Sequence, residues 1–287
     1  MIENKLKKIL GPRKLNSDKR DYGHVLVLAG SVGLTGAAYL ASTASCLSGS
    51  GLVTLGIPSS LNPIMEVKLT EAMTLPLPQT KEASLSEQAL GKIKLFLKNI
   101  SAVALGPGIS RNQQTQKLVQ KLLPVLDKPT VLDADGINAV VGKVKILDKF
   151  KNQLIITPHA GEFARLLNIN IKQVQKNRAM LASDFARKHG VIVVLKGQRT
   201  IVASPDKRLY INQTGNPGMA SGGCGDVLCG MIASFLGQGI EAFRAAELAV
   251  YLHGLAGDYA AKEKTQSCLL ATDILNSLPQ AFKKLAK

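Results

Sequence analysis

The chain has little aromatic content and no tryptophan, since aromatics make up 4% of its 287 residues while apolar residues make up 46%. Its core must therefore come from Leu, Ile, Val and Ala, a composition that suits helices covering a parallel sheet. It has four cysteines, none in CxxC spacing, and no His and Cys set has zinc-site spacing. This usage predicts free thiols in a reducing, cytoplasmic compartment.

Residues 22–65 contain no Asp, Glu, Lys or Arg. A membrane span would need about 18 uninterrupted apolar residues, but Gly, Ser, Thr and two prolines break this stretch. Residues 1–20 alternate charges with leucines and lack the apolar centre of a signal peptide. We therefore expect a buried segment rather than a membrane anchor, with residues 1–20 as a charged entry segment.

The formal net charge is +16, with a pI near 9.8. The lysines are spread over the whole chain, without a basic stretch interleaved with aromatics. This pattern argues against nucleic-acid binding and favours a basic surface that attracts small polyanions.

Residues 216–228 read Asn-Pro-Gly-Met-Ala-Ser-Gly-Gly-Cys-Gly-Asp-Val-Leu, after which an apolar helical pattern continues. Glycines at a helix start let backbone amides point at one anion, and the helix dipole favours negative charge there. The predicted anion hole is Gly222, Gly223, Cys224 and Gly225, with Asp226 as a base that deprotonates a hydroxyl. An equally good interpretation of this motif alone is a glycine-rich turn capped by Asp226.

Short apolar runs alternate with helical patterns, which predicts an α/β fold with a mostly parallel sheet. The expected strands are residues 24–29, 51–57, 101–105, 129–133, 153–156 and 191–195, with a hairpin at 200–203 and 208–211. The expected helices are one that follows the glycine loop at residues 30–36 and ends near 47, residues 86–97, one ending near 123, and most of the chain after 225, including 242–261. Residues 58–70 are predicted as a short helix and a strand, and residues 73–84 as a loop, because of Pro76 and Pro78.

Several strands end in polar or glycine motifs, namely residues 106–108, 133–138, 157–162 and 196–197. In an open α/β sheet the carboxyl ends of the strands carry the site, so these motifs are expected to line one crevice. The glycine loop at residues 30–36 lacks the Gly-Lys-Ser/Thr ending of a Walker P-loop. That absence excludes a P-loop nucleotide site.

For several candidate site residues, the sequence allows two interpretations of their role. His159 and Glu162 fit a binding role or a structural hydrogen bond, and Lys196 fits a phosphate partner or a solvated lysine. Asp133 and Asp135 fit magnesium reached through water, while capping of the next helix is the alternative for Asp133. The alternatives for Cys224 are a reactive thiol at a helix end and a small packing residue, and packing is favoured. His253 lies in an apolar helical pattern and is predicted to be structural.

The ordered set of motifs resembles the nicotinamide-nucleotide hydrate dehydratases. The set comprises Gly106-Pro107-Gly108, Asp133-Ala134-Asp135-Gly136, Thr157-Pro158-His159, Leu195-Lys196-Gly197 and the run from Gly222 to Gly230, together with residues 23–36 and 253–258. The resemblance runs from about Tyr22 to Asp273. It implies a ribokinase-like α/β fold, with helices on both faces of the sheet, as one domain over residues 1–287.

The resemblance also implies an activity, namely repair of hydrated NADH and NADPH by phosphorylation of the added hydroxyl from ADP or ATP, followed by loss of phosphate. It places Asp226 at the substrate hydroxyl and places Ala37, Gly108 and His159 against the hydrated substrate. The implied nucleotide contacts are Lys196, Gly197, Gln198, Arg199, Thr200 and Gly225. Mg²⁺ is implied through the phosphates, with Glu162 as a candidate ligand.

The sequence departs from the family pattern at Cys224, where Thr or Ser is usual, and at Cys229, which replaces a small residue. Many relatives carry a preceding epimerase domain, and with about twenty residues before the fold we expect that activity on a separate chain. The resemblance further implies a homo-oligomer, typically a tetramer, in the cytoplasm.

Two alternatives remain at this stage. A small-alcohol kinase of the same fold, such as a vitamin-precursor kinase, shares the glycine-Asp loop but gives no reason for residues 157–162. A non-enzymatic basic binding protein would show steeply salt-dependent association with DNA and no nucleotide binding.

Overall fold

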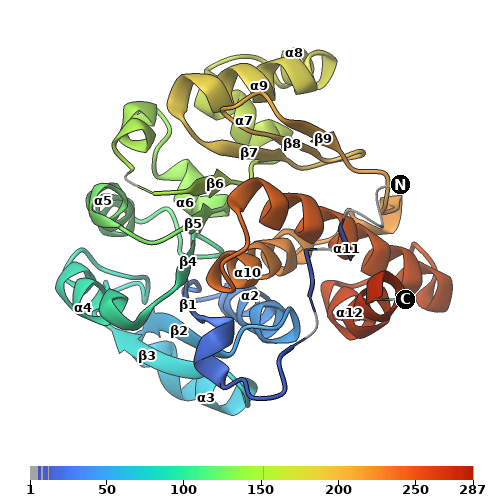
Figure 1. Cartoon of the computed structure of the whole chain (residues 1–287). Coiled ribbons are helices and arrows are strands. Elements are labelled where there is room, and N and C mark those ends of the chain that lie inside the picture. The colour runs from blue at the N-terminus through green and yellow to red at the C-terminus, as the bar shows by residue number, and fades with distance from the viewer. Residues whose placement is uncertain (1–5, 8, 12, 151, 287) are drawn as a thin grey trace.

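The structure is a computed structural model and describes residues 6–7, 9–11, 13–150 and 152–286. Its centre is one nine-stranded sheet with the order β3-β2-β1-β4-β5-β6-β7-β8-β9 (Figure 1). Strands β1 to β7 pair in parallel, and β8 and β9 extend the sheet as an antiparallel hairpin. The strands are β1 His24–Leu28, β2 Leu52–Pro58, β3 Met73–Leu77, β4 Ala102–Leu105, β5 Thr130–Leu132, β6 Leu154–Ile156, β7 Ile192–Leu195, β8 Ile201–Ala203 and β9 Leu209–Ile211.

Alternate strand residues enter two separate hydrophobic cores, as the pleat of a strand requires. In β1, Val25 and Val27 belong to one core, while Leu26 and Leu28 belong to the other. All four are fully buried, so the continuous apolar run reflects burial on both faces. The predicted mostly parallel α/β fold with helices on both faces is confirmed.

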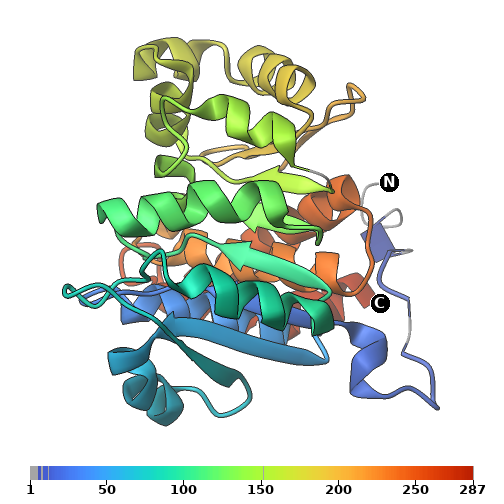
Figure 2. The ribbon, with the colours of Figure 1, turned by 90° about the vertical axis from the view of Figure 1, so that its left-hand side faces the viewer.

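Helices α2, α10, α11 and α12 contribute to the core on one face, and α4, α5, α7 and α9 contribute to the core on the other. Figure 1 shows α4 and α5 to the left of the sheet with α2, α10 and α12 to its right, and Figure 2 views the layer from the left-hand side. The helices are α2 Thr35–Leu47, α3 Asn62–Lys68, α4 Ala89–Phe96, α5 Gln113–Leu122, α6 Ala134–Asn138, α7 Ala160–Leu167, α8 Ile171–Lys176, α9 Arg178–His189, α10 Cys224–Gly237, α11 Ala242–Lys264 and α12 Ala271–Ala286.

Between residues 58 and 84 the predicted short helix is confirmed as α3, but the predicted strand and loop were wrong. Strand β3 lies inside the predicted loop, and residues 58–70 form a 3₁₀ turn and α3 without a strand. Strand β3 is the last strand of the sheet and pairs only with β2. Because an edge strand has one unpaired side, it tolerates Pro76, the residue that made the segment look like a loop.

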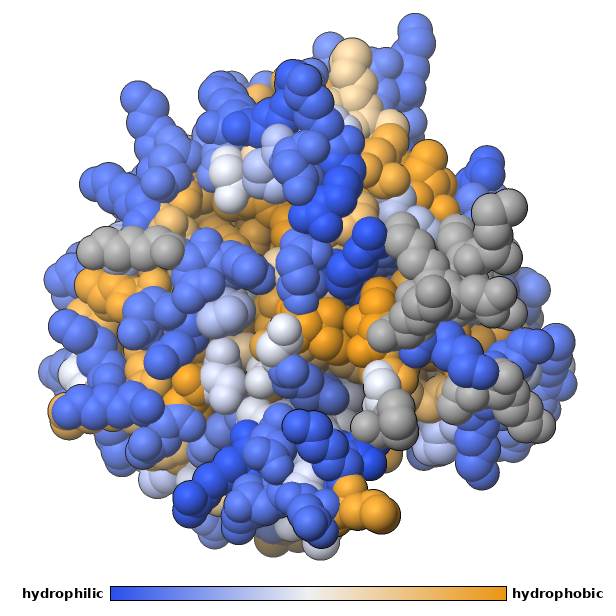
Figure 3. All heavy atoms as spheres, viewed as in Figure 1, coloured by the Kyte–Doolittle hydropathy of each residue, from blue (hydrophilic) through white to orange (hydrophobic). Residues whose placement is uncertain are grey.

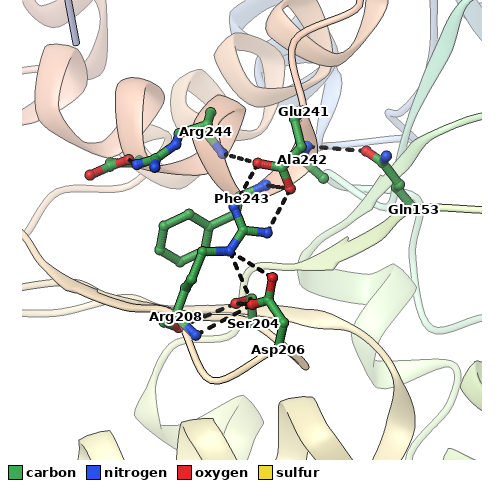
Figure 4. A network of polar contacts seen from close by, with 9 residues as sticks. Gln153, Ser204, Asp206, Arg208, Glu241, Ala242, Phe243 and Arg244 are labelled. Atoms are coloured by element: carbon green, nitrogen blue, oxygen red, sulfur yellow. Dashed lines mark hydrogen bonds and ion pairs between the residues drawn. The ribbon is translucent and has the colours of Figure 1, made fainter. Parts of the chain in front are cut away.

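The β8–β9 hairpin is attached to the start of α11 by a polar network (Figure 4). The Arg208 guanidinium donates to both oxygens of Asp206 and, with its two other nitrogens, to both oxygens of Glu241 at 3.0 Å. Glu241 also caps α11 by accepting from the Phe243 and Arg244 amides. The Arg208 side chain therefore joins the β8–β9 hairpin to the start of α11.

The segment that follows β9 is held along α11. The side-chain amide of Asn212 donates to the carbonyl of Val250 at 3.0 Å, and the Thr214 hydroxyl donates to the carbonyl of Tyr251 at 2.8 Å. The Asp258 carboxylate then accepts from the Gly215 amide at 2.9 Å. These bonds hold residues 212–215 against α11, before the chain reaches the start of α10.

Hydrophilic side chains cover most of the face seen in Figure 3, with small hydrophobic areas between them. In the described part of the chain, no helix has the length and apolar content that a membrane span requires.

Candidate functional site

A cavity of about 1010 Å³ opens where β5, β6 and β7 end and α10 begins. The crevice predicted at the carboxyl ends of the strands therefore exists. Its lining includes most of the residues proposed from the sequence, namely Asp133, His159, Glu162, Lys196, Gly197, Gln198, Arg199, Thr200, Gly223, Cys224, Gly225 and Asp226.

Four proposed residues do not line this cavity: Ala37, Gly108, Gly222 and Asp135. Ala37 and Gly108 lie together, because a Cβ built on Gly108 would approach the Ala37 Cβ to 3.0 Å. Their loops are joined by the Ser31 hydroxyl, which donates to the Gly108 carbonyl at 2.8 Å. The structure thus groups these two residues with each other, at the ends of β1 and β4, apart from the cavity wall.

The mouth of α10 has the backbone form of an anion site. Gly223 adopts φ 93°, a left-handed conformation that suits glycine, and it stands directly before the helix. Among the described residues, no backbone oxygen accepts from the amides of Gly225 or Asp226. Two donors at a helix N-terminus beside a cavity favour a bound anion, because the helix dipole adds positive potential there.

Lys196 extends beneath this helix mouth. Its ammonium lies 2.6 Å from one carboxylate oxygen of Asp133, which is 1% exposed. The same ammonium would be 3.2 Å from a Cβ on Gly225, so only glycine leaves it room at its present position. Burial alone would lower the pKa of Lys196, but the Asp133 and Glu162 charges outweigh burial and raise that pKa. A permanent positive charge therefore sits beside the open amides.

Asp226 occupies the first turn of α10 and faces the same cavity. Burial raises the pKa of its carboxyl to about 7, and the negative charge of Asp133 adds to this, while Lys196 opposes it. A carboxylate whose pKa lies near neutrality can accept a proton and also release it at working pH. Asp226 thus has the property that a general base requires.

His159 and Glu162 form a capping box at the start of α7. The His159 Nδ1 accepts from the amides of Gly161 and Glu162, and the Glu162 carboxylate accepts from the His159 amide at 2.9 Å. Burial lowers the pKa of His159, with Glu162 opposing, so the ring is neutral near pH 7 with its hydrogen on Nε2. The spacing of a capping residue and a Glu three positions later was a readable sequence signal for this local structure.

The two aspartates of the Asp133-Ala134-Asp135 motif have different surroundings. Asp135 accepts from the Ser110 amide and from the Asn138 side chain, both at 3.1 Å, and so anchors the loop after β4. Asp133 is the N-cap of α6 but its side chain makes no capping bond, and its Oδ2 is buried without a hydrogen-bond partner among the described residues. Of these two aspartates, only Asp133 lines the cavity.

His253 and Cys224 connect α11 to the helix mouth. The buried His253 Nε2 lies 2.9 Å from the Cys224 carbonyl, and burial lowers the pKa of His253 to about 4. Burial also raises the pKa of the Cys224 thiol, so this cysteine is a packing residue rather than a reactive thiolate. The structural interpretation of His253 and the packing interpretation of Cys224 agree with this arrangement.

A sequence model of the NAD(P)H-hydrate dehydratases matches residues 25–280. The chain belongs to this family. The chain is 44% identical, over 95% of its length, to the bifunctional NAD(P)H-hydrate repair enzyme of Moorella thermoacetica, and it spans 52% of that protein. It therefore covers about half the length of the bifunctional relatives.

Other NAD(P)H-hydrate dehydratase relatives match over nearly their whole length. The ADP-dependent (S)-NAD(P)H-hydrate dehydratase of Bacillus subtilis is 32% identical, with 98% of this chain and 97% of that protein aligned. A crystal structure of the ADP/ATP-dependent B. subtilis enzyme, co-crystallised with ATP and Mg²⁺, superposes with a TM-score of 0.84 over 99% of this chain and 97% of that one. A ribokinase-like superfamily protein of Enterococcus faecalis superposes with a TM-score of 0.85 at 27% identity, covering 99% and 95% of the two chains.

Proposed function

We propose that this chain dehydrates the S-epimer of hydrated NADH and NADPH, driven by the hydrolysis of ADP or ATP. The observation that carries the proposal is the pairing of a near-neutral base, Asp226, with two open amides and the Lys196 ammonium at one cavity wall. Membership of the NAD(P)H-hydrate dehydratase family supports it, as does the printed activity of the B. subtilis relative.

The proposed chemistry has two steps whose atoms balance. In the first, the added hydroxyl on the nicotinamide ring attacks the terminal phosphorus of the nucleotide, its proton passes to Asp226, and the bond from that phosphorus to the rest of the nucleotide breaks. In the second, the ring C–O bond breaks with phosphate leaving, helped by the ring-nitrogen lone pair. Loss of a neighbouring ring proton then restores the double bond of NADH.

The residues take the following proposed roles. The amides of Gly225 and Asp226 and the ammonium of Lys196 stabilise charge on the transferring phosphoryl group. Lys196, Gly197, Gln198, Arg199 and Thr200 hold the nucleotide on the cavity wall that they line. His159 holds the hydrated substrate from the same wall, and the adjoining Ala37 and Gly108 hold its remoter part. Gly222 and the neighbouring glycines leave the helix mouth accessible.

Mg²⁺ fits this site only as an ion shared with phosphate. Among the described residues, no group of three His, Cys, Asp or Glu side chains is arranged to hold a metal. Mg²⁺ is usually held by one or two carboxylates together with phosphate oxygens. The unpartnered Oδ2 of Asp133 and the buried carboxylate of Glu162 are hard oxygen donors of this kind. Bound there with phosphate oxygens, the ion would supply charge neutralisation.

The decisive experiment incubates the purified protein with Mg²⁺, ADP or ATP and (S)-hydrated NADH. Recovery of reduced-nicotinamide absorbance, with one phosphate released per NADH, is the expected result. A stable phosphorylated product without NADH would instead indicate the small-alcohol kinase, and DNA binding without nucleotide binding would indicate the non-enzymatic alternative.

Asp226→Asn should bind nucleotide and lose turnover by roughly 10²–10⁴-fold. Full turnover by this variant would remove the base assignment.

Two proposals concern the enzyme's surroundings. We expect a homotetramer in the cytoplasm. Light scattering of the purified protein tests the oligomeric state directly.

We also expect an NAD(P)H-hydrate epimerase to act on the same substrate pool, because relatives that carry this domain are bifunctional. Without an epimerase, the enzyme should leave the R-epimer unchanged. When an epimerase is added, the enzyme should consume the R-epimer as well.

A further inference from the structure

Arg178 binds the main chain of the loop that follows β7. It is the first residue of α9, and its half-buried guanidinium reaches across to three carbonyl oxygens. One terminal nitrogen donates to Leu195 at 3.0 Å and to Lys196 at 3.4 Å, and the other donates to Gln198. No other described side chain is recorded donating to more than one of these three oxygens.

The remaining carbonyl in this run is also occupied, since the Thr200 hydroxyl donates to Gly197 at 3.0 Å. The four carbonyls of residues 195–198 therefore all accept bonds from side chains. By contrast, none of the amides of residues 197–200 donates to a backbone acceptor within the described residues. A run of amides left open in this way forms the kind of concavity that binds anions.

The loop backbone does not favour this form by itself. Gly197 adopts φ 139°, and Arg199 adopts φ 54°, in the left-handed region that costs a non-glycine residue about 1 kcal/mol or more. Such a conformation persists only when neighbouring groups hold it. Arg178 is that neighbour, because its guanidinium donates to the carbonyls on both sides of Gly197.

A guanidinium suits this task better than an ammonium. Its donors lie in a rigid planar fork, so one group can serve several fixed oxygens at once, and its charge strengthens each bond. A lysine at residue 178 would keep the charge but present it as a compact point on a flexible stem. It could not bridge all three carbonyls in the same way.

We propose that Arg178 is a positioning residue that holds the loop of residues 196–200 so that the amides of residues 197–200 stay open to the phosphate groups of a nucleoside di- or triphosphate. The inference rests on the proposed function insofar as that function places the nucleotide at this loop. It adds a residue outside the loop, 18 positions before Lys196 in sequence, that determines whether the loop can bind.

The test compares Arg178→Lys and Arg178→Ala with the wild type and with Arg187→Lys. Arg187 lies on the same helix, is exposed and forms a local ion pair with Asp184, so it is a matched control. Calorimetry should show the Kd for Mg²⁺-ADP rising roughly 10- to 100-fold in both Arg178 variants, the loss expected for charged hydrogen bonds. The KM for the hydrated dinucleotide should stay unchanged, and Arg187→Lys should match the wild type.

Amide hydrogen exchange separates this role from general stability. At a Mg²⁺-ADP concentration that saturates the wild type, bound phosphate should protect the amides of residues 197–200, and the Arg178 variants should lose this protection while α10 and the β-sheet keep theirs. Wild-type ADP affinity in Arg178→Lys would overturn the inference. So would fast exchange throughout β7 and α9, because Arg178 would then be a general stabilising residue.

The inference and the proposed function fail separately. If the wild type turns over hydrated NADH and the Arg178 variants keep its nucleotide KM, only the inference is lost. If the wild type binds ADP in an Arg178-dependent way but restores no NADH, only the proposed function is lost.

Discussion

The ammonium of Lys196 lies 2.6 Å from one oxygen of Asp133, while the second oxygen of that buried carboxylate has no hydrogen-bond partner among the described residues. The two residues are 63 positions apart and come from the ends of β7 and β5. Their pairing places one positive and one negative group behind the mouth of α10. Burial raises the pKa of Asp226 most, and the charge balance of this pair adjusts it further, because Asp133 raises the pKa and Lys196 lowers it.

Asp133→Asn should therefore change the pH dependence of turnover as well as its rate. Removing the negative charge leaves Lys196 unopposed, so the pKa of Asp226 should fall and the acidic limb of the rate profile should move to lower pH. Breaking this nearly buried pair should also cost about 2–4 kcal/mol of stability. Asp135→Asn is the control, and its limb should move less, because Asp135 contributes less to the pKa of Asp226.

The wild-type rate itself should follow the ionisation of Asp226. Because burial raises this pKa to about 7, turnover should drop roughly tenfold per pH unit below that value and level off above it. Stopped assays at saturating nucleotide measure this profile. A profile flat from pH 5 to 8 would show that another group takes the proton.

Asp226→Asn should stabilise the protein, and the gain should depend on pH. A carboxyl whose folded pKa is raised holds its proton longer in the native state, so native stability declines as pH rises from about 4 to about 7. Asparagine removes that penalty, so the gain should be about 1–3 kcal/mol at pH 8 and much smaller at pH 5. Thermal unfolding of both proteins at the two pH values gives the comparison. An equal gain at both would refute the raised pKa.

Gly225→Ala should weaken nucleotide binding while leaving the fold intact. The new Cβ would stand 3.2 Å from the Lys196 ammonium, which its bond to Asp133 holds in place. We expect a rise in the nucleotide Kd of up to about tenfold, because the contact is tighter than ordinary packing and the ammonium must shift to relieve it. Gly91→Ala is the control: its Cβ meets nothing within 4 Å in α4, so stability should rise by up to about 1 kcal/mol with binding unchanged.

The Arg208 network in Figure 4 should behave as one cooperative unit. Arg208→Ala and Glu241→Gln should each cost about 1–2 kcal/mol, since the contacts are bidentate but Arg208 is 38% exposed at its side chain. The double variant should cost clearly less than the sum, by about 1 kcal/mol, and the coupling should shrink in high salt. Strict additivity would mean that the two residues act independently.

Much of the fold was predictable because its signals are local. Residues 25–29 and 102–105 are continuous apolar runs that the two-sided burial of a parallel strand requires, and the capping box at His159 and Glu162 spans one helical turn. Strand β3 was missed because its proline is acceptable only at the sheet edge, and edge position is a property of the assembled sheet.

By itself, the sequence determined the order of most strands, the polar or glycine motifs at the ends of several of them, and the glycine-rich start of α10. These follow from periodicity, turn chemistry and burial, which act over a few neighbouring residues. Only the tertiary structure decided that Lys196 meets Asp133, that Arg178 binds the loop after β7, and that Ala37 and Gly108 lie together outside the cavity wall. Each of these contacts joins separate elements, and its geometry is set by how those elements pack, which no local pattern encodes.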